Sequence, residues 1–308
     1  MSPELQWTQY KATHNLKFNA KEDALRLGIF KNNLKTIHNL NKKGGAQYGV
    51  TQFSHLTTEE FKGTYTNRRP IPKNDPKTVV TYPVLEDIPD AFDWTKSDPP
   101  VVEPVYNQGQ CGSCWAFSGV EAIQAAYAIS GKPLTDFSVQ EIVDCNHIDG
   151  VAGCDGGWPF TVYEYIQTKS KGLENKSDYP YVGVDQTCAE SAGKIIKFDV
   201  PSYQNISKDE EALVGVVYNQ GPVSMAMDAT LLQFYFGGII DYEPCGKTLD
   251  HALLIVGYGT GKHLGSEVKY WKIKNSWGAS WGESGYYRIV RNKDKCGLAQ
   301  ALTIPKVN

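Results

Sequence analysis

Gln108-Gly-Gln-Cys111-Gly-Ser-Cys114-Trp-Ala-Phe117 is the stretch of sequence that decides how this chain is interpreted. Residues 115–129 form an Ala-rich segment with apolar residues at helical spacing, and Gly131 is a typical helix stop. The pattern predicts a helix with Cys114 in its first turn. Unpaired backbone N–H groups and the positive end of the helix dipole favour a thiolate there. We therefore expect Cys114 to be a nucleophile, with a neighbouring imidazolium supplying most of its activation.

A Cys-x-x-Cys pair also occurs in zinc sites and in thioredoxin-like redox sites. A four-cysteine zinc site needs a second such pair. The other cysteines are scattered without that spacing, at Cys145, Cys154, Cys188, Cys245 and Cys296. A redox pair belongs in a compact strand–helix unit of about 100 residues, whereas this chain has 308 residues. Both alternatives are disfavoured, and we expect no metal and no cofactor.

Two downstream residues are candidate partners of the thiol. Of the six histidines, only His251 begins an apolar run, residues 251–257, which is typical of a buried strand. A base on a strand can be held within hydrogen-bond reach of a nucleophile on a helix, although a structural core histidine gives the same pattern. Asn275 follows a second strand-like run, residues 270–274, and its amide oxygen could orient an imidazole. Simple turn chemistry is the alternative for this residue.

These residues together resemble the papain family of cysteine proteases, nearest to its cathepsin L-like branch. Cys-Gly-Ser-Cys-Trp is a local signature of that family, and here a His follows 137 residues and an Asn 161 residues after Cys114. The resemblance implies an α+β, papain-like fold of two lobes with a cleft between them, preceded by a mainly helical propeptide. The left lobe would be helical, at about 98–199. The right lobe would be rich in strands, at about 200–308, and would include the mature N-terminal strand.

The resemblance also implies the chemistry, a cysteine endopeptidase that hydrolyses peptide bonds through an acyl-enzyme. Cys114 would attack the peptide carbonyl, His251 would transfer protons and Asn275 would orient the imidazole. The side-chain N–H of Gln108 and the backbone N–H of Cys114 would bind the oxyanion. The segment 161–181 contains no histidine and no occluding loop like that of cathepsin B, so we expect an endopeptidase rather than an exopeptidase.

Substrate-binding positions are carried over from the family in the same way. The backbone of Gly156 and Gly157 would bind an extended peptide by strand-like hydrogen bonds. The pocket for the residue two positions before the scissile bond (P2) has only apolar walls, formed by Trp158, Pro159, Ala226, Leu249 and Ala301. We therefore expect an apolar or aromatic P2 residue rather than Arg. Asp250 and Trp277, which neighbour His251 and Asn275, complete the expected set.

Seven cysteines are an odd number, as three disulfides and one free thiol would give. By resemblance the pairs are Cys111–Cys154, Cys145–Cys188 and Cys245–Cys296. Structural disulfides indicate an oxidising route, hence a secreted or lysosomal/endosomal protein, and sequons at Asn175 and Asn205 fit that route. No apolar run is long enough to span a membrane. The chain also begins without a signal peptide, and we expect Met1 to start a trimmed form of the natural product.

A second pattern precedes the signature. Six residues at spacings of 4, 4, 3, 4 and 4 lie along one stripe of a helix: Glu22, Arg26, Phe30, Asn33, Ile37 and Asn41. Taken alone, they describe an amphipathic surface helix. Residue for residue, they match the ERFNIN motif of cathepsin L-like propeptides. Residues 49–55 resemble the second propeptide motif, Gly-x-Asn-x-Phe-x-Asp, with Thr51 in place of the Asn and His55 in place of the Asp.

Composition divides the chain into three parts. We expect a helical inhibitory prodomain at 1–61, an extended linker crossing the cleft at 62–87, and the mature peptidase at 88–308. Residues 1–87 hold 13 Lys/Arg and 8 Asp/Glu, whereas the remainder holds 18 and 26, so a basic pro-segment precedes an acidic enzyme. We expect protonation of carboxylates at acidic pH to weaken this attraction and permit cleavage near residues 80–90, with His55 gaining charge between pH 5 and 7.

Two rival functions remain. A catalytically silent relative would use its cleft or pro-region for binding, which the intact Cys114, His251, Asn275 and Gln108 disfavour. Acyl transfer to amines is disfavoured by Asn rather than Asp at position 275 and by the propeptide. The expected partners are protein and peptide substrates, the chain's own propeptide and cystatin-like inhibitors. We expect no nucleic acid partner and a monomeric protein.

Overall fold

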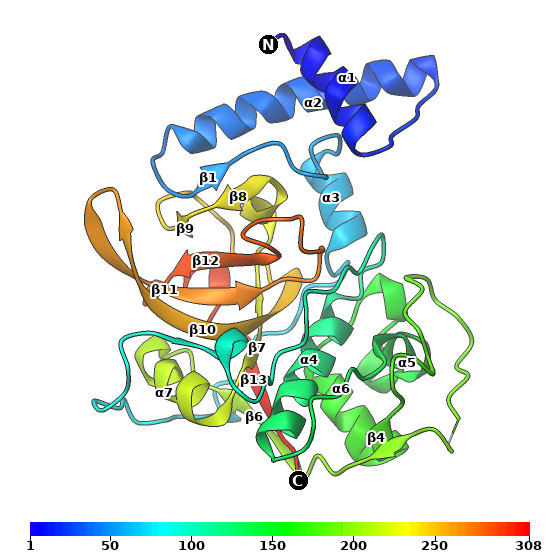
Figure 1. Ribbon diagram of the computed structural model, residues 1–308, viewed down its shortest axis with the longest axis vertical. Coiled ribbons are helices and arrows are strands. Elements are labelled where there is room, and N and C mark those ends of the chain that lie inside the picture. The colour runs from blue at the N-terminus through cyan, green and yellow to red at the C-terminus, as the bar shows by residue number, and fades with distance from the viewer. Residues whose placement is uncertain (192) are drawn as a thin grey trace.

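The prodomain lies at one end of the molecule, farthest from the C-terminus (Figure 1). The computed structural model describes residues 1–191 and 193–308. Helix α1 (Pro3–Thr13) crosses the long helix α2 (Ala20–Asn41), and strand β1 (Gln47–Tyr48) and helix α3 (Thr58–Tyr65) follow. Polar side chains cap the three helix starts by accepting from backbone N–H groups: Ser2, Asn19 and Thr57.

Helix α3 corrects one predicted boundary. Thr57 and Glu60 form a reciprocal capping box at its start, and Phe61 is fully buried. The helix therefore continues to Tyr65, so the extended part of the linker begins after residue 65 and not at residue 62.

One lobe of the expected mature part (residues 88–308, below called the enzyme part) is helical. Its central helix α4 (Cys114–Ile129) is buried along nearly its whole length, which explains its Ala-rich composition. The other regular elements of this lobe are α5 (Val139–Cys145), α6 (Phe160–Tyr165) with a π-helical turn (Ile166–Ser170), β4 (Gly172–Leu173), β5 (Ile196–Lys197) and short 3₁₀ turns (Ile148–Gly150, Gly153–Asp155). The predicted helix starting at Cys114 is confirmed.

The other lobe is built on a mainly antiparallel sheet, and helix α7 (Glu210–Gln220) contacts one of its strands, β10 (His251–His263). In spatial order the strands are β2 (Val79–Val80), β6 (Ser202–Ile206), β13 (Leu302–Lys306), β7 (Val223–Met227), β10 (His251–His263), β11 (Ser266–Lys274), β12 (Tyr286–Val290) and β9 (Ile239–Ile240). Strand β3 (Phe92–Asp93) also pairs with β10. The pairs β2–β6 and β12–β9 are parallel. Short 3₁₀ turns lie at Trp94–Lys96, Thr230–Phe234 and Lys295–Gly297.

The prodomain shares the core of the sheet lobe. Its side chains Ile37, Phe53 and Phe61 belong to the same apolar cluster as the buried residues of the sheet, and β1 pairs with β8 (Tyr235–Gly237). A separate cluster of Trp7, Tyr10 and Phe30 holds α1 on α2. The prodomain is therefore an integral layer of this structure and not a loose extension.

The two lobes meet where α4 packs against β10. Ser118 on α4 donates a hydrogen bond to the carbonyl oxygen of Leu253 on β10 at 2.7 Å and contacts the Ser224 hydroxyl at 2.6 Å. Because Cys114 begins α4 and His251 begins β10, this interface brings the two residues to the same end. The helical lobe, the sheet lobe and the preceding helical prodomain confirm the expected α+β, two-lobe class.

Three disulfides stabilise the enzyme part: Cys111–Cys154, Cys145–Cys188 and Cys245–Cys296. These are the pairs that the resemblance implied, and Cys114 is the free cysteine. Since Cys111 is bonded to Cys154, Cys111 and Cys114 do not form a redox disulfide here. Among the helices that the structure describes, none combines the length and apolarity needed to cross a bilayer.

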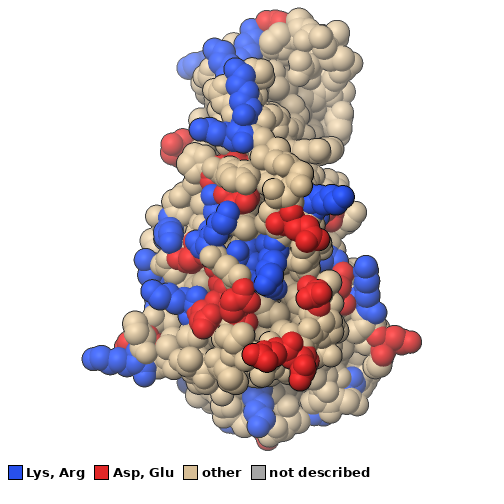
Figure 2. Space-filling model, turned by 90° about the vertical axis from the view of Figure 1, so that its left-hand side faces the viewer, with Lys and Arg blue, Asp and Glu red and all other residues tan. Residues whose placement is uncertain are grey.

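Surface charge follows the division found in the sequence. On the face shown in Figure 2, Lys and Arg side chains gather along one side of the prodomain, whereas the body beneath it carries both signs. Three ion pairs join the parts directly among the described residues: Lys62 of the pro-segment binds Asp228 and Asp250, and Arg68 binds Asp155.

Candidate active site

Cys114, His251 and Asn275 come together at the junction of the lobes. Cys114 is the first residue of α4, His251 the first of β10, and Asn275 directly follows β11. The backbone N–H of Ala252 donates to Cys114 Sγ at 3.5 Å, which places the thiol beside the start of β10. All three side chains are almost completely buried.

The hydrogen bonds of Asn275 determine the tautomer of His251. His251 Nε2 lies 2.8 Å from Asn275 Oδ1, and the same oxygen accepts from the backbone N–H of Ser276 at 2.8 Å. Because the oxygen can only accept, Nε2 carries a proton and a neutral ring has its lone pair on Nδ1. Within the described residues His251 Nδ1 has no hydrogen-bond partner. Trp277 stacks on the imidazole with ring centroids 4.5 Å apart and covers this bond.

Burial sets the charge states of the pair. Desolvation raises the pKa of the Cys114 thiol to about 12 and lowers the pKa of His251 to about 4. Burial therefore favours the neutral forms of both groups in this prodomain-covered form. It opposes the thiolate expected from the helix start alone, because burying a charge is costly.

Gln108 lies in the site, but its side-chain amide already has hydrogen-bond partners. Its Nε2 donates to the carbonyl oxygens of Cys111 at 2.8 Å and of Tyr65 at 3.1 Å, and its Oε1 accepts from Ser276 Oγ at 2.7 Å. Trp277 Nε1 donates to the same Tyr65 oxygen at 3.1 Å. A carbonyl of the pro-segment thus holds the amide N–H that we expected to bind an oxyanion.

The pro-segment continues across Cys114 in an extended conformation. Asn67 N–H donates to the Asp250 carbonyl at 2.6 Å, and Asn67 Oδ1 accepts from Gly157 N–H at 2.7 Å. Gly156 has a φ of +116°, and a Cβ there would lie 2.3 Å from Asn67 Oδ1. Only glycine permits this close approach.

Ile71 of the pro-segment fills an apolar pocket next to the thiol. Its N–H donates to the Leu249 carbonyl at 2.6 Å, and its side chain is 4% exposed. The pocket consists of buried apolar residues with Trp158 at its edge: Cys114, Ala226, Leu249, Ala252 and Ala301. Four of the five residues expected to form the P2 pocket therefore lie around Ile71, namely Trp158, Ala226, Leu249 and Ala301. The fifth, Pro159, is buried as the N-cap of α6.

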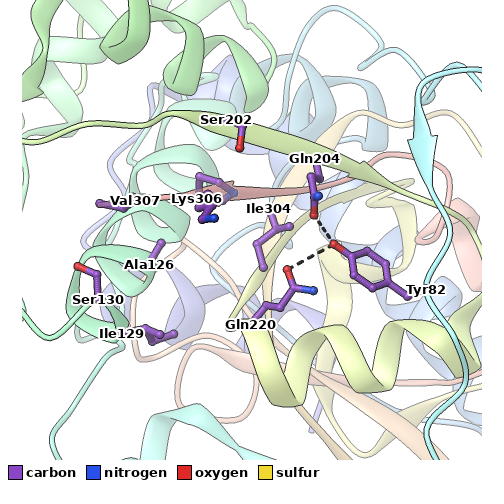
Figure 3. Close-up of a pocket in the computed structure, with 11 residues that line it drawn as sticks. Tyr82, Ala126, Ile129, Ser130, Ser202, Gln204, Gln220, Ile304, Lys306 and Val307 are labelled. Atoms are coloured by element: carbon purple, nitrogen blue, oxygen red, sulfur yellow. Dashed lines mark hydrogen bonds between the residues drawn. The ribbon is translucent and has the colours of Figure 1, made fainter.

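Beyond the pocket, the linker is attached to the sheet lobe. Asn74 Nδ2 donates to the Leu302 carbonyl at 2.8 Å, and β2 extends the sheet along β6. Tyr82 then closes one side of a cavity of about 340 Å³ between the end of α4 and strands β6 and β13, and its hydroxyl points to the amides of Gln204 and Gln220 (Figure 3). The linker is therefore held on both sides of Cys114.

The helical stripe of the prodomain has an internal structural role. Arg26 binds Glu22 and Glu60, each at 2.6 Å. Asn33 Nδ2 donates to the carbonyls of Ser54 and Leu56, each at 2.9 Å. Asn41 pairs with the backbone of Tyr48 at 2.9 Å through both its amide atoms, while Phe30 and Ile37 are buried. The stripe thus fixes the loop that docks on the enzyme.

The two departures from the second propeptide motif have different outcomes. Thr51 docks the loop, because its hydroxyl donates to the Gln233 carbonyl at 2.6 Å. His55 lies against Tyr10, with the Tyr10 hydroxyl 2.9 Å from His55 Nδ1. Desolvation and the nearby Arg26 lower the pKa of His55 to about 4. The expectation that His55 gains charge between pH 5 and 7 is therefore wrong for the folded prodomain.

Asp228 is a member of the site that the sequence did not indicate. Its carboxylate and that of Asp250 both bind the Lys62 ammonium, at 3.2 and 2.7 Å. The sequence also did not indicate three residues of the pro-segment that contact the site: Tyr65, Asn67 and Ile71. Each lies far from its partners in the sequence, and no local pattern marks a residue that makes its contacts only after docking.

Comparisons with known proteins match nearly the whole chain. The family described as papain family cysteine protease matches residues 88–306, and the cathepsin propeptide inhibitor domain matches residues 7–61. Procathepsin L of Mus musculus is 37% identical over 313 residues, which cover 98% of this chain and 92% of that protein. Cathepsin L2 of Homo sapiens is 36% identical over 316 residues, 99% of this chain and 92% of that protein.

Solved structures agree with this result. The digestive procathepsin L2 proteinase from the larval midgut of Tenebrio molitor has a TM-score of 0.86 and 32% identity, and the match covers 99% of this chain and 100% of that one. The proform of the ragweed pollen allergen Amb a 11, a cysteine protease, has a TM-score of 0.82 and 33% identity, with coverage of 99% and 95%.

Proposed function

The chain belongs to the papain family of cysteine proteases and is a procathepsin L-like zymogen, and we propose that Cys114, His251, Asn275 and Gln108 are its catalytic residues. The observation that carries this proposal is the hydrogen bond between His251 Nε2 and Asn275 Oδ1, because it leaves Nδ1 as the nitrogen that can exchange a proton with the thiol.

The proposed reaction begins once the prodomain has left and water reaches the pair. Proton transfer from Cys114 Sγ to His251 Nδ1 gives a thiolate, which attacks the peptide carbonyl carbon. The Gln108 Nε2–H and the Cys114 backbone N–H stabilise the oxyanion, an effect of about 3 kcal/mol for one donor in comparable sites. His251 then protonates the leaving amine, and water hydrolyses the thioester with His251 as base.

The prodomain inhibits by occupying these same positions. The Tyr65 carbonyl takes the hydrogen bond from Gln108, Asn67 takes that from Gly157, and Ile71 fills the apolar pocket. We infer that the pocket is the P2 site, so that the linker runs opposite to a substrate and presents no peptide bond in the orientation for attack. The buried residues that surround Ile71 are apolar, which supports a preference for an apolar or aromatic P2 residue over Arg.

Release of the prodomain at acidic pH follows from the ion pairs between the pro-segment and the enzyme part. Lys62 binds Asp228 and Asp250, and Arg68 pairs with Asp155. Burial raises the pKa of Asp250, and the Lys62 ammonium opposes that shift. Because Lys62 and a proton compete for this carboxylate, a fall in pH weakens docking of α3.

The proposal also covers the setting of the enzyme. The three disulfides favour folding in an oxidising compartment, hence a secreted or lysosomal/endosomal location, and the sequons at Asn175 and Asn205 are candidate glycosylation sites. We expect the enzyme to be a monomer, and we expect the cleft opened by prodomain removal to be the binding site for cystatin-like inhibitors.

Mass spectrometry of the zymogen at about pH 4.5, with and without an epoxide that alkylates thiols, tests the proposal. We expect loss of residues 1–87, one adduct on Cys114, and cleavage of a reporter peptide with Phe at P2 but not with Arg. The Cys114→Ser zymogen is the matched control and should stay intact and unlabelled. A parent chain that remains uncut, unlabelled and inactive would contradict the proposal.

A further inference from the structure

The ammonium of Lys62 lies between two buried carboxylates beside the candidate catalytic histidine. Its Nζ is 3.2 Å from Asp228 Oδ1 and 2.7 Å from Asp250 Oδ2. The side chains of the two acids are only 6% and 9% exposed. Asp250 directly precedes His251, so the cation site adjoins the reaction centre.

The two carboxylates are fixed by the enzyme part alone. Asp250 Oδ1 accepts from the Ala229 N–H at 2.9 Å, and Asp228 Oδ1 accepts from the N–H of Thr230 at 2.9 Å and from its hydroxyl at 2.5 Å. A Cβ on Gly246 would lie 2.4 Å from Asp228 Oδ2, so this part of the chain backs the second carboxylate closely. The acids therefore keep their positions when the prodomain leaves.

Lys62 is the cation that pairs with these acids, and it belongs to the segment that is removed. Among the described residues no other Lys or Arg forms an ion pair with Asp228 or Asp250. Removal of the prodomain thus leaves two adjacent carboxylates without a cation, in a position where a lysine side chain of a peptide is already seen to bind. Two neighbouring negative charges in a partly desolvated site favour a cationic ligand.

The position of Lys62 indicates which part of a substrate would replace it. Along the linker, Ile71 lies on one side of Cys114 and α3 on the other. If the Ile71 pocket takes P2, the α3 side takes residues after the scissile bond. Lys62 lies four residues before Thr66, where the chain leaves α3. This separation is about 6 Å along a helix, a distance that about two residues of an extended peptide would span.

We propose that Asp228 and Asp250 form a cation-binding subsite of the mature enzyme that selects Lys or Arg one or two positions after the scissile bond. This inference rests on the proposed function and deepens it, since it names the substrate class on the leaving-group side. Asp228 is the specificity-determining residue, because Asp250 directly precedes His251 in the chain whereas Asp228 lies on a separate segment.

The test compares quenched fluorescent peptides that share an apolar P2 residue and differ only after the scissile bond, with Lys or Met at the first or second position. Met matches the length of Lys without its charge. We expect the acid-activated parent to cleave a Lys peptide about five- to tenfold better in kcat/KM than its Met counterpart at one of the two positions. In Asp228→Asn this ratio should fall below about twofold.

Asp155→Asn is the matched control. Asp155 also loses a prodomain cation, Arg68, but lies next to Gly156 on the other side of Cys114, so its ratio should equal that of the parent. If Asp228→Asn does not fold, the salt dependence of the parent decides. The Lys preference should disappear between about 0.05 M and about 1 M salt while cleavage of the Met peptide is retained.

The outcomes separate this inference from the proposed function. Equal cleavage of the Lys and Met peptides by the parent, or a preference that survives Asp228→Asn or high salt, overturns the inference while the protease stands. Absence of any cleavage, together with no adduct on Cys114, overturns both.

Discussion

Truncation of Ile71 to Ala should open the zymogen while leaving the enzyme intact. The Ile71 side chain is 4% exposed in the pocket formed with Ala226, Leu249 and Ala301. The change removes three carbon groups from an apolar environment, at about 0.8 kcal/mol each, or about 2.4 kcal/mol in total. Since 1.4 kcal/mol corresponds to about a tenfold change in an equilibrium constant, the fraction of molecules with an uncovered thiol should rise about fiftyfold.

The assay is the rate at which an epoxide alkylates Cys114 at about pH 7.5, where the chain stays uncut, followed by intact mass. Val84→Ala is the matched control, because Val84 is an aliphatic residue of the same linker but is 56% exposed. Its labelling rate should equal that of the parent. Equal rates for Ile71→Ala and the parent, or the same increase in Val84→Ala, would refute the assignment of Ile71 as the plug of the pocket.

Three further predictions follow from individual contacts. Asn275→Ala removes the acceptor that orients His251 and should lower kcat of the activated enzyme about tenfold, whereas KM for the same reporter peptide should change little. Gly45→Ala places a Cβ 1.8 Å from Glu243 Oε1, which accepts the hydrogen bond from the Ala46 N–H. This change should lower the melting temperature of the Cys114→Ser zymogen by several degrees in calorimetry. The control Gly63→Ala lies in α3 with nothing within 4 Å of the new Cβ, so the melting temperature should stay equal or rise. His55 faces Tyr10, His14, Arg26 and Glu60, and its folded pKa of about 4 lies below its unfolded value of about 6.5, so the stability it contributes is present above pH 6.5 and lost as the pH falls to 4. The melting temperature of the Cys114→Ser zymogen that also carries His55→Asn should therefore fall less over this pH range than that of Cys114→Ser alone. Parallel curves for the two variants would contradict the reasoning.

The prodomain motif shows how a pattern on one helix can serve a contact made elsewhere. Arg26, Asn33 and Asn41 bind the loop and helix that follow them, and within the described part of the chain they form no hydrogen bond with the enzyme part. That loop then contacts the sheet lobe through Thr51 and through the β1–β8 pair. The stripe therefore acts on the cleft indirectly, by fixing the shape of the surface that docks.

Local periodicity was enough to locate the framework of the site. The helix beginning at Cys114 and the strand beginning at His251 lie where the apolar patterns placed them, and Asn275 follows its predicted strand. These features could be predicted because backbone hydrogen bonding imposes repeats of 3.6 and 2 residues on any segment that buries one face. The resemblance to a family added the disulfide pairs, which spacing alone left open.

Only the tertiary structure decided the state of the site. The Gln108 amide is held by a carbonyl 43 residues earlier, Lys62 binds Asp228 across 166 residues, and helix α3 ends at Tyr65 where the chain enters the cleft. Burial favours the neutral forms of Cys114 and His251 here although the sequence indicated a thiolate. A charge state depends on how much water remains around a group and on every charged or polar atom near it, and those neighbours come from distant parts of the chain. The sequence by itself therefore determined which groups lie at the junction of the lobes. The packed prodomain determined that these groups are buried, that the Gln108 amide is already hydrogen-bonded, and that neutral forms are favoured.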